Sequence, residues 1–296
     1  MDSAALRAFV AVAEQGSFSR AADSLFLTQS AVSKRIAALE DELRAPLFDR
    51  IGRSVHLTEA GAVLLTRARR ILAEIEAGRQ AIADLGGTVA GRLRLGTSHH
   101  IGLHYLPPVL RAFTVSYPAV ELDLRFLESE AACEAVERSE LELAVVTLPE
   151  SPAVALATET LWPDPLAFAV GPDHALCQLT PPLAPAMLAD QPAVLPAPAT
   201  FTRRIVAAAL APFGVRPHVT LETNYLETIK MMVAVGLGWS VLPRTMLADG
   251  ELQPLEIAGI DLERRLGLVR RDGRTLGNAA RAFRALVRAQ RSADRG

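Results

Sequence analysis

The chain has 296 residues, of which 50% are hydrophobic and 22% are charged, and its formal net charge is −2 at pH 7. This length is enough for a small module and a larger two-lobed domain, each with its own core. The sequence has no apolar run of the roughly 20 residues that a membrane span requires, and its N-terminus lacks a secretion-signal pattern. We therefore predict a cytoplasmic protein with no membrane partner.

Neither the cysteines nor the net charge identifies a partner. Cys133 and Cys177 lie far apart without Cys-x-x-Cys spacing, which argues against a disulfide framework and a thiolate metal site and favours buried, inert thiols. The first 90 residues carry eleven basic and eleven acidic side chains, so this region has no basic excess. Any binding to DNA must depend on a few cations placed on one face.

Three helices are predicted in the N-terminal region. Apolar residues at helical spacing predict a first helix that ends at Gly16, and a short second helix follows over 19–26. Thr28 can cap a third helix over 29–43. The apolar stripe of the third helix must face a core, and it consists of Val32, Ile36, Leu39 and Leu43.

The opposite face of the third helix is short, polar and cationic. It carries Gln29, Ser30, Ser33 and Lys34. Such a face fits the major groove of DNA, where glutamine pairs with adenine, lysine reaches guanine or phosphate, and serine reaches either. A solvated helix face explains the same residues, and the helix alone does not separate the two interpretations.

A hairpin is predicted over 46–57, because an apolar alternation is interrupted by a turn that contains Gly52. Arg50 and Arg53 would project from this wing towards DNA phosphates, which fixes orientation without reading sequence. The whole N-terminal region resembles the signature of the LysR family of bacterial transcription regulators. The residues that carry the resemblance are Phe9, Ala13, Gly16, Ser17, Phe18, Ala21, Ala22, Leu25, Thr28, Gln29, Ser30, Ala31, Val32, Ser33, Ile36, Leu39, Glu40, Leu43, Leu47, Phe48, Arg50, Leu57, Thr58, Glu59, Ala60 and Gly61.

The resemblance implies a winged helix-turn-helix DNA-binding domain over 1–58. In it, the base-reading candidates are Gln29, Ser30, Ser33 and Lys34, and Arg50 and Arg53 hold phosphates from the wing. Thr28 and Arg35 lie beside these residues and complete the predicted DNA-binding set.

A long helix is predicted to follow from Thr58 and Glu59 to about residue 85, and with the hinge it forms the segment 59–89. Its heptad seam favours pairing with a second subunit over packing on its own domain. The seam consists of Leu64, Ala68, Ile71, Ile75, Gly78, Ile82 and Leu85. A homodimer would present two recognition helices to double-stranded DNA with a two-fold operator. The family resemblance adds a tetramer formed through C-terminal domains.

Residues 90–296 alternate between predicted strands and helices, which indicates a parallel α/β domain. Prolines near 163–172 suggest a crossing to a second lobe, giving lobe I at about 90–162 and 267–296 and lobe II at about 163–266. This resembles the LysR effector domain, itself similar to periplasmic binding proteins. The matching residues are Pro107, Phe113, Tyr117, Pro118 and the segment 235–243, whereas Glu142 and the region of Ser129 depart from the family pattern.

Two α/β lobes form a cleft at strand ends and helix N-termini, where a small anionic effector such as a carboxylate would bind. The predicted effector-binding residues are Thr97, Ser98, His99, His100, Thr147, Thr200, Phe201, Thr202, Arg203 and Asn224. Thr97, Ser98 and Thr200 could instead serve only as helix caps. His100 and His104 have the i, i+4 spacing of a chelating pair, but no third ligand is evident, so we predict no metal and no cofactor.

Three other functions explain less of the chain. An enzyme is not expected, because no nucleophile elbow, phosphate loop or complete dinucleotide fingerprint is present. A solute-binding protein for transport would leave the N-terminal module unexplained. A thiol redox sensor would require Cys133 and Cys177 to meet. We therefore predict a regulator in which effector binding closes the cleft and changes the placement of the DNA-binding pair.

Overall fold

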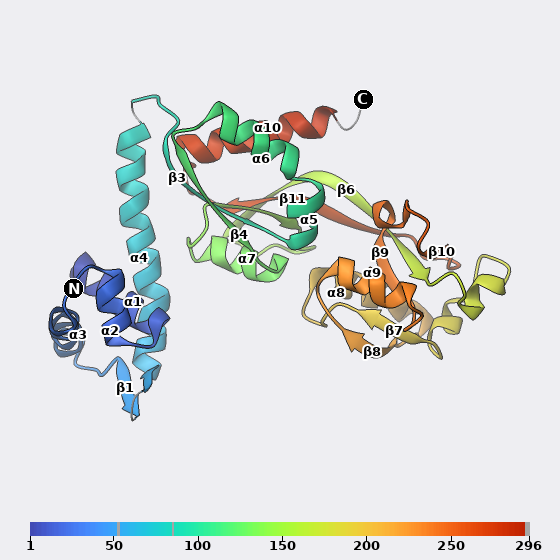
Figure 1. Ribbon diagram of the computed structural model, residues 1–296, viewed down its shortest axis with the longest axis horizontal. Coiled ribbons are helices and arrows are strands. Elements are labelled where there is room, and N and C mark those ends of the chain that lie inside the picture. Colours follow the sequence, from blue (N-terminus) through green and yellow to red (C-terminus); the bar gives the residue numbers. More distant parts are fainter. Residues whose placement is uncertain (52–53, 85, 294–296) are drawn as a thin grey trace. The chain divides into compact units, whose positions relative to one another are not determined.

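The computed structural model describes residues 1–51, 54–84 and 86–293 (Figure 1). The chain divides into two compact units, one formed by residues 1–87 with 138–140 and one by the remainder. Each unit has its own buried core. None of the described helices is long and apolar enough to cross a membrane.

The first unit begins with three short helices, α1 (Ser3–Gln15), α2 (Phe18–Ser24) and α3 (Gln29–Leu43). Each has a capped N-terminus, where the side chain of Asp2, Ser17 or Thr28 accepts a hydrogen bond from a backbone N–H. The prediction that the second helix reaches residue 26 is wrong. It ends at Ser24, because Phe26 takes a left-handed conformation (φ 54°) and its side chain is 96% exposed.

The core of the first unit joins the three helices to the wing and to the long helix α4 (Glu59–Asp84). The wing consists of strands β1 (Phe48–Ile51) and β2 (Ser54–Leu57), which pair antiparallel, and the predicted turn at 52–53 lies outside the described residues. The Glu40 carboxylate accepts hydrogen bonds from the N–H groups of Leu47 and Phe48, at 2.7 and 3.3 Å. These bonds fix the wing to the helix that precedes it.

Helix α4 follows the predicted bounds, and its apolar seam changes partners along its length. Ala68 is fully buried in the core of the first unit, and Leu64 packs against the same core. Farther along, Ile71 is 37% exposed and Ile82 is 73% exposed, while Leu85 lies outside the described residues. The second half of the seam is therefore apolar but uncovered within its own unit.

The second unit begins with lobe I, in which strands β3 (Gly91–Thr97), β4 (Val120–Phe126) and β5 (Leu143–Thr147) run parallel. Four helices pack with them, namely α5 (His99–His104), α6 (Pro107–Ser116), α7 (Ser129–Glu137) and the C-terminal α10 (Asn278–Ala293). The side chains of Phe113 and Phe283 meet edge to face between α6 and α10, with ring centroids 5.4 Å apart.

Two long strands, β6 (Leu156–Val170) and β11 (Leu262–Arg271), connect the lobes (Figure 1). They pair antiparallel along most of their length, with a register shift between Leu266 and Gly267. The expectation of a parallel sheet is therefore correct only in part. The seven-stranded sheet is mixed, because the chain crosses to lobe II and returns on neighbouring strands that run in opposite directions.

Lobe II contains strands β7 (Pro192–Leu195) and β8 (His218–Glu222), helices α8 (Phe201–Leu210) and α9 (Leu226–Ala234), and strands β9 (Ser240–Pro243) and β10 (Gln253–Leu255). Trp239 is fully buried in its core, and its indole N–H donates to the carbonyl of Leu188 at 3.1 Å. Gly238 precedes it with φ 143°, and a Cβ there would lie 2.2 Å from the carbonyl oxygen of Pro192. The lobe II core requires glycine at this position.

Candidate functional sites: a helix face for DNA and a cleft between lobes

Helix α3 presents the predicted DNA-binding residues on its outer face. Thr28, Gln29, Ser30 and Lys34 are exposed, while Ser33 and Arg35 are partly exposed. The opposite stripe, Val32, Ile36 and Leu39, is buried in the core of the first unit. Packing thus fixes which face of α3 remains open to a partner.

Hydrogen bonds order the beginning of this face. The Thr28 hydroxyl accepts from the N–H of Ala31 at 3.2 Å and lies 3.0 Å from the Ser30 hydroxyl. The Ser19 hydroxyl donates to Oε1 of Gln29 at 3.1 Å, so this bond uses the amide oxygen of the glutamine. Arg50 lies on β1, and Arg53 lies outside the described residues.

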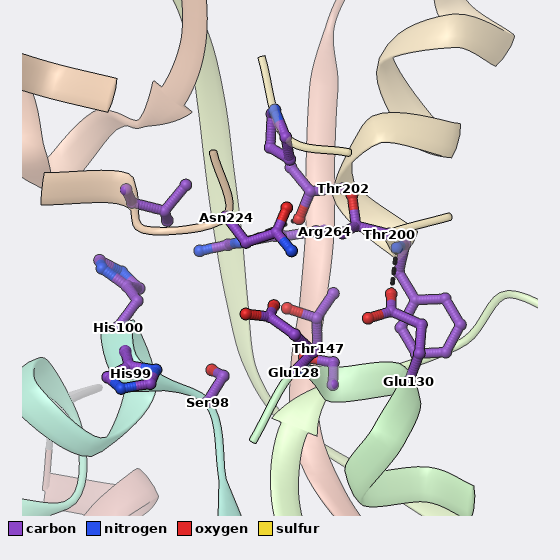
Figure 2. Close-up of a pocket in the computed structure, with 14 residues that line it drawn as sticks. Ser98, His99, His100, Glu128, Glu130, Thr147, Thr200, Thr202, Asn224 and Arg264 are labelled. Atoms are coloured by element: carbon purple, nitrogen blue, oxygen red, sulfur yellow. Dashed lines mark hydrogen bonds between the residues drawn. The ribbon is translucent and has the colours of Figure 1, made fainter. Parts of the chain in front are cut away.

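The second site is a pocket between the lobes of the second unit (Figure 2). Its volume is about 40 Å³. Eight predicted effector-binding residues line it, and they are Ser98, His99, His100, Thr147, Thr200, Phe201, Thr202 and Asn224. Lobe I contributes Ser98 with the beginning of α5, the beginning of α7 and the end of β5, and lobe II contributes the beginning of α8 and the segment before α9.

Two predicted residues do not line the pocket. The Thr97 side chain is fully buried, and its hydroxyl donates to the carbonyl of Val145 at 2.9 Å, so it serves the pairing of β3 and β5. Arg203 donates from Nη1 to the carbonyl of Pro196 at 3.4 Å and is absent from the pocket lining. The expectation that Arg203 supplies the cation of the cleft is not supported by its placement.

Arg264 on β11 is the cation that lines the pocket, and sequence reasoning missed it. Its Nε donates to Oδ2 of Asp164 at 2.6 Å and its Nη1 to the Thr202 hydroxyl at 3.1 Å. Arg264 and Asp164 are 5% and 1% exposed. Nη2 of Arg264 is buried without a hydrogen-bond partner among the described residues, and Figure 2 shows Arg264 between Asn224 and Thr202.

Two carboxylates, also missed from sequence, lie across the pocket from these donors. Glu130 accepts a hydrogen bond from the backbone N–H of Phe201, the first residue of α8, and so connects the lobes. Burial, with a smaller contribution from the Glu130 charge, raises the pKa of Glu128. Ser129 between them begins α7, and its hydroxyl accepts from the N–H of Thr147 at 3.2 Å.

The helix-cap interpretation holds for one of the three hydroxyl residues. Thr200 caps α8 by accepting from the N–H of Arg203 at 3.2 Å. Ser98 is the residue before α5, but its side chain makes no cap hydrogen bond. Ser98 therefore has a hydroxyl in the pocket that its own helix does not use.

The histidines of α5 have different surroundings. His99 lies against Phe126 and Tyr225, with ring centroids 5.3 and 4.7 Å apart. His100 is 5% exposed, and burial, reinforced by the Arg264 charge, lowers its pKa to about 4. The sequence showed no third group beside His100 and His104, but the fold brings Glu227 of α9 next to both.

Comparisons with known proteins agree with this architecture. Residues 3–62 match the model of the "bacterial regulatory helix-turn-helix protein, lysR family", and residues 86–292 match the "LysR substrate binding domain". The transcriptional regulator CbbR of Rhodospirillum rubrum is 34% identical over 289 residues, 96% of this chain and 95% of its own. An uncharacterized regulator of Azotobacter vinelandii is 65% identical over 108 residues, 36% of this chain and 75% of its own.

Among solved structures, a full-length variant of OxyR from Pseudomonas aeruginosa has a TM-score of 0.70 at 24% identity, and the match covers 98% of this chain and 94% of that one. This likeness shows the fold. The two family models and the near-full-length relative show more, because they cover both units: the chain belongs to the LysR family of DNA-binding transcriptional regulators and carries that family's effector-binding domain.

Proposed function

We propose that this protein acts in the cytoplasm as a homodimer, assembling further into a tetramer, that binds a two-fold DNA operator through α3 and responds to a small anion held between its lobes. The exposed polar face of α3 supports DNA binding, and the exposed apolar residues in the second half of α4 support dimerisation. The buried Nη2 of Arg264, which has no hydrogen-bond partner among the described residues, supports binding of an anion.

Arg264 favours an anion because a buried guanidinium N–H without a partner costs free energy that an acceptor on the ligand recovers. The negative charge of Asp164 balances that of Arg264, but Asp164 accepts a hydrogen bond only from Nε. Nη2 therefore remains available to donate a hydrogen bond to a ligand. The amide of Asn224 and the hydroxyls of Ser98 and Thr202 lie in the same pocket. Glu128 and Glu130 can accept further hydrogen bonds beyond those from Asn224 and from the Phe201 N–H. We infer an effector that joins an anionic group to hydroxyl or amino substituents.

The pocket must widen to admit such a molecule, which is the opposite of the cleft closure predicted from the sequence. Its volume of about 40 Å³ is well below the roughly 300 Å³ at which small-molecule pockets begin. The hydrogen bond from Phe201 to Glu130 joins lobe II to lobe I across the pocket, whereas the Arg264–Thr202 bond lies within lobe II. Effector entry therefore changes the separation of the lobes, and that change is the signal that reaches the DNA-binding units.

The effector part is tested by thermal unfolding of the purified protein with a panel of small carboxylates and phosphates, each with and without hydroxyl or amino substituents. A ligand should raise the unfolding temperature, and Ser98→Ala should reduce that increase. Ser116→Ala, on an exposed position of α6, is the matched control and should leave it unchanged. Stabilisation by cations but by no anion would contradict the proposed ligand class.

The DNA part is tested by capturing genomic fragments on the purified protein and footprinting the enriched sites. Lys34→Ala should weaken specific binding by roughly 1–3 kcal/mol if Lys34 reads a base. The chain's other lysine, Lys230, is paired with Asp249 and Glu251 in lobe II, so Lys230→Ala is the matched control. Protection without two-fold character would contradict the dimeric mode.

A further inference from the structure

Three potential metal ligands meet where the lobes face each other. His100 and His104 lie one turn apart on α5 of lobe I, and Glu227 lies in the first turn of α9 of lobe II. Nδ1 of His100 is 3.7 Å and Nε2 of His104 is 3.1 Å from Oε1 of Glu227. One ligand atom from each of the three lies within 4.8 Å of the others.

His100 supplies a second observation that points to a ligand. Its side chain is only 5% exposed, yet neither ring nitrogen has a hydrogen-bond partner among the described residues. Buried polar atoms are rarely left unsatisfied, and such an exception calls for an unseen partner. His104 and Glu227 are 49% and 41% exposed, so the cluster is open to solvent on one side.

The donor set matches borderline divalent metals. Imidazole suits zinc, nickel and copper, and two histidines with one glutamate form a known three-ligand zinc set that leaves a fourth position for water. Tetrahedral ligands about 2.1 Å from zinc lie roughly 3.4 Å apart. The two distances to Glu227, 3.7 and 3.1 Å, bracket that separation. The ligand atoms of the two imidazoles lie within 4.8 Å of each other, so closing the triad requires the two rings to approach.

We propose that His100, His104 and Glu227 bind a divalent transition-metal ion, with Zn²⁺ as the reference ion, and that this ion joins lobe I to lobe II. The site borders the effector pocket through His100. Because its ligands come from both lobes, the bound ion restrains their separation. The ion therefore acts on the same movement that admits the effector, and its binding can be measured in the absence of DNA and effector.

The test is a titration with Zn²⁺ of the untagged full-length protein, from which metal has first been removed with a chelator. Isothermal titration calorimetry measures the binding. We expect one ion per chain. His104→Ala and Glu227→Gln should each weaken binding by at least about tenfold, because even the loss of an outer-shell partner of a metal ligand costs about 10- to 100-fold. His218→Ala, an exposed histidine of β8, is the matched control and should leave affinity unchanged. Circular dichroism confirms that the variants fold.

Two measurements separate this site from other zinc binding. Co²⁺ loaded in place of Zn²⁺ should give the visible absorption bands of a tetrahedral site, and His104→Ala should abolish them. If Glu227→Gln binds Zn²⁺ as tightly as the parent, the histidine pair chelates alone and the bridge between lobes is overturned. If the parent takes up no ion, or if all variants retain it, the site itself is overturned.

Discussion

Arg264 and Asp164 show how one buried pair organises the surroundings of the effector pocket. Beyond the bond to Arg264, Asp164 accepts from the Tyr105 hydroxyl at 3.2 Å. Burial, with the Asp164 charge and hydrogen bond, raises the pKa of Tyr105 to about 12. Tyr105 also packs on Trp162, with ring centroids 5.2 Å apart. Removing either charge would leave the other buried without its counter-charge, which typically costs about 3–5 kcal/mol.

Cys133 allows a prediction about thiol chemistry. It is 6% exposed on α7, and burial, together with the charges of Glu130 and Glu134, raises its pKa to about 12. Because the thiolate is the reactive form, we expect Cys133 to react with iodoacetamide far more slowly than a free thiol in the folded protein. Mass spectrometry of the modified protein measures this rate.

The control for this prediction is the unfolded chain, in which both cysteines should react at ordinary rates. Cys177 belongs to a different core cluster, in lobe II, and both cysteines are free. DNA binding by Cys133→Ser and the parent should therefore show the same response to peroxide. A peroxide response that Cys133→Ser abolishes would revive the thiol-sensor alternative.

At the scale of elements, α4 carries the prediction about assembly. Ile82 is 73% exposed on the predicted heptad seam, and Val63, 62% exposed, lies off that seam. We expect Ile82→Glu to shift the protein towards monomers, because a charge on a coiled-coil seam must be desolvated on pairing. Sedimentation velocity measures the change. Val63→Glu should leave the oligomeric state unchanged, and equal effects of both variants would contradict pairing through the seam.

Helix α10 is attached to β6 by a charged cluster that makes stability depend on pH. Arg284 donates to Glu159 at 2.9 Å, and Arg288 donates to the same carboxylate. Burial would raise the pKa of Glu159, but the hydrogen bonds and charges of Arg288 and Arg284 outweigh it and lower the pKa from 4.5. A carboxylate with a lowered folded-state pKa stabilises the fold above its unfolded pKa and loses this contribution as pH falls through the folded value.

We predict that Glu159→Gln reduces the loss in the free energy of unfolding that the protein shows as pH falls. Urea unfolding at pH values from neutral to below 4.5 should show the parent losing stability more steeply than the variant, while the variant is the less stable protein at neutral pH. Glu121→Gln, at an exposed position on β4, provides the control. Parallel pH profiles for parent and Glu159→Gln would show that the cluster contributes nothing.

At the scale of the whole molecule, local signals were sufficient for most elements. Caps such as Asp2 and Thr28, the stripe of α3 and the heptads of α4 all act within a few turns of the chain. Contacts between distant segments were not predictable in the same way: Arg264 meets Asp164 across 100 residues, and His104 meets Glu227 across 123. A hint was present, because alternation along β11 places Arg264 on the same face as Leu262 and Leu266.

The two units have separate cores, and this separation predicts how the protein unfolds. Ile36, 2% exposed, belongs to the core of the first unit, and Phe113, 1% exposed, belongs to the core of lobe I. Scanning calorimetry at fixed protein concentration should show two transitions, as chains with independent domains do. Ile36→Ala should lower the free energy of unfolding of the first unit by about 2–5 kcal/mol. Phe113→Ala should lower that of the second unit by about 3–5 kcal/mol. If both variants lowered one shared transition, the two units would unfold as one cooperative body, and their separate cores would not be independently stable.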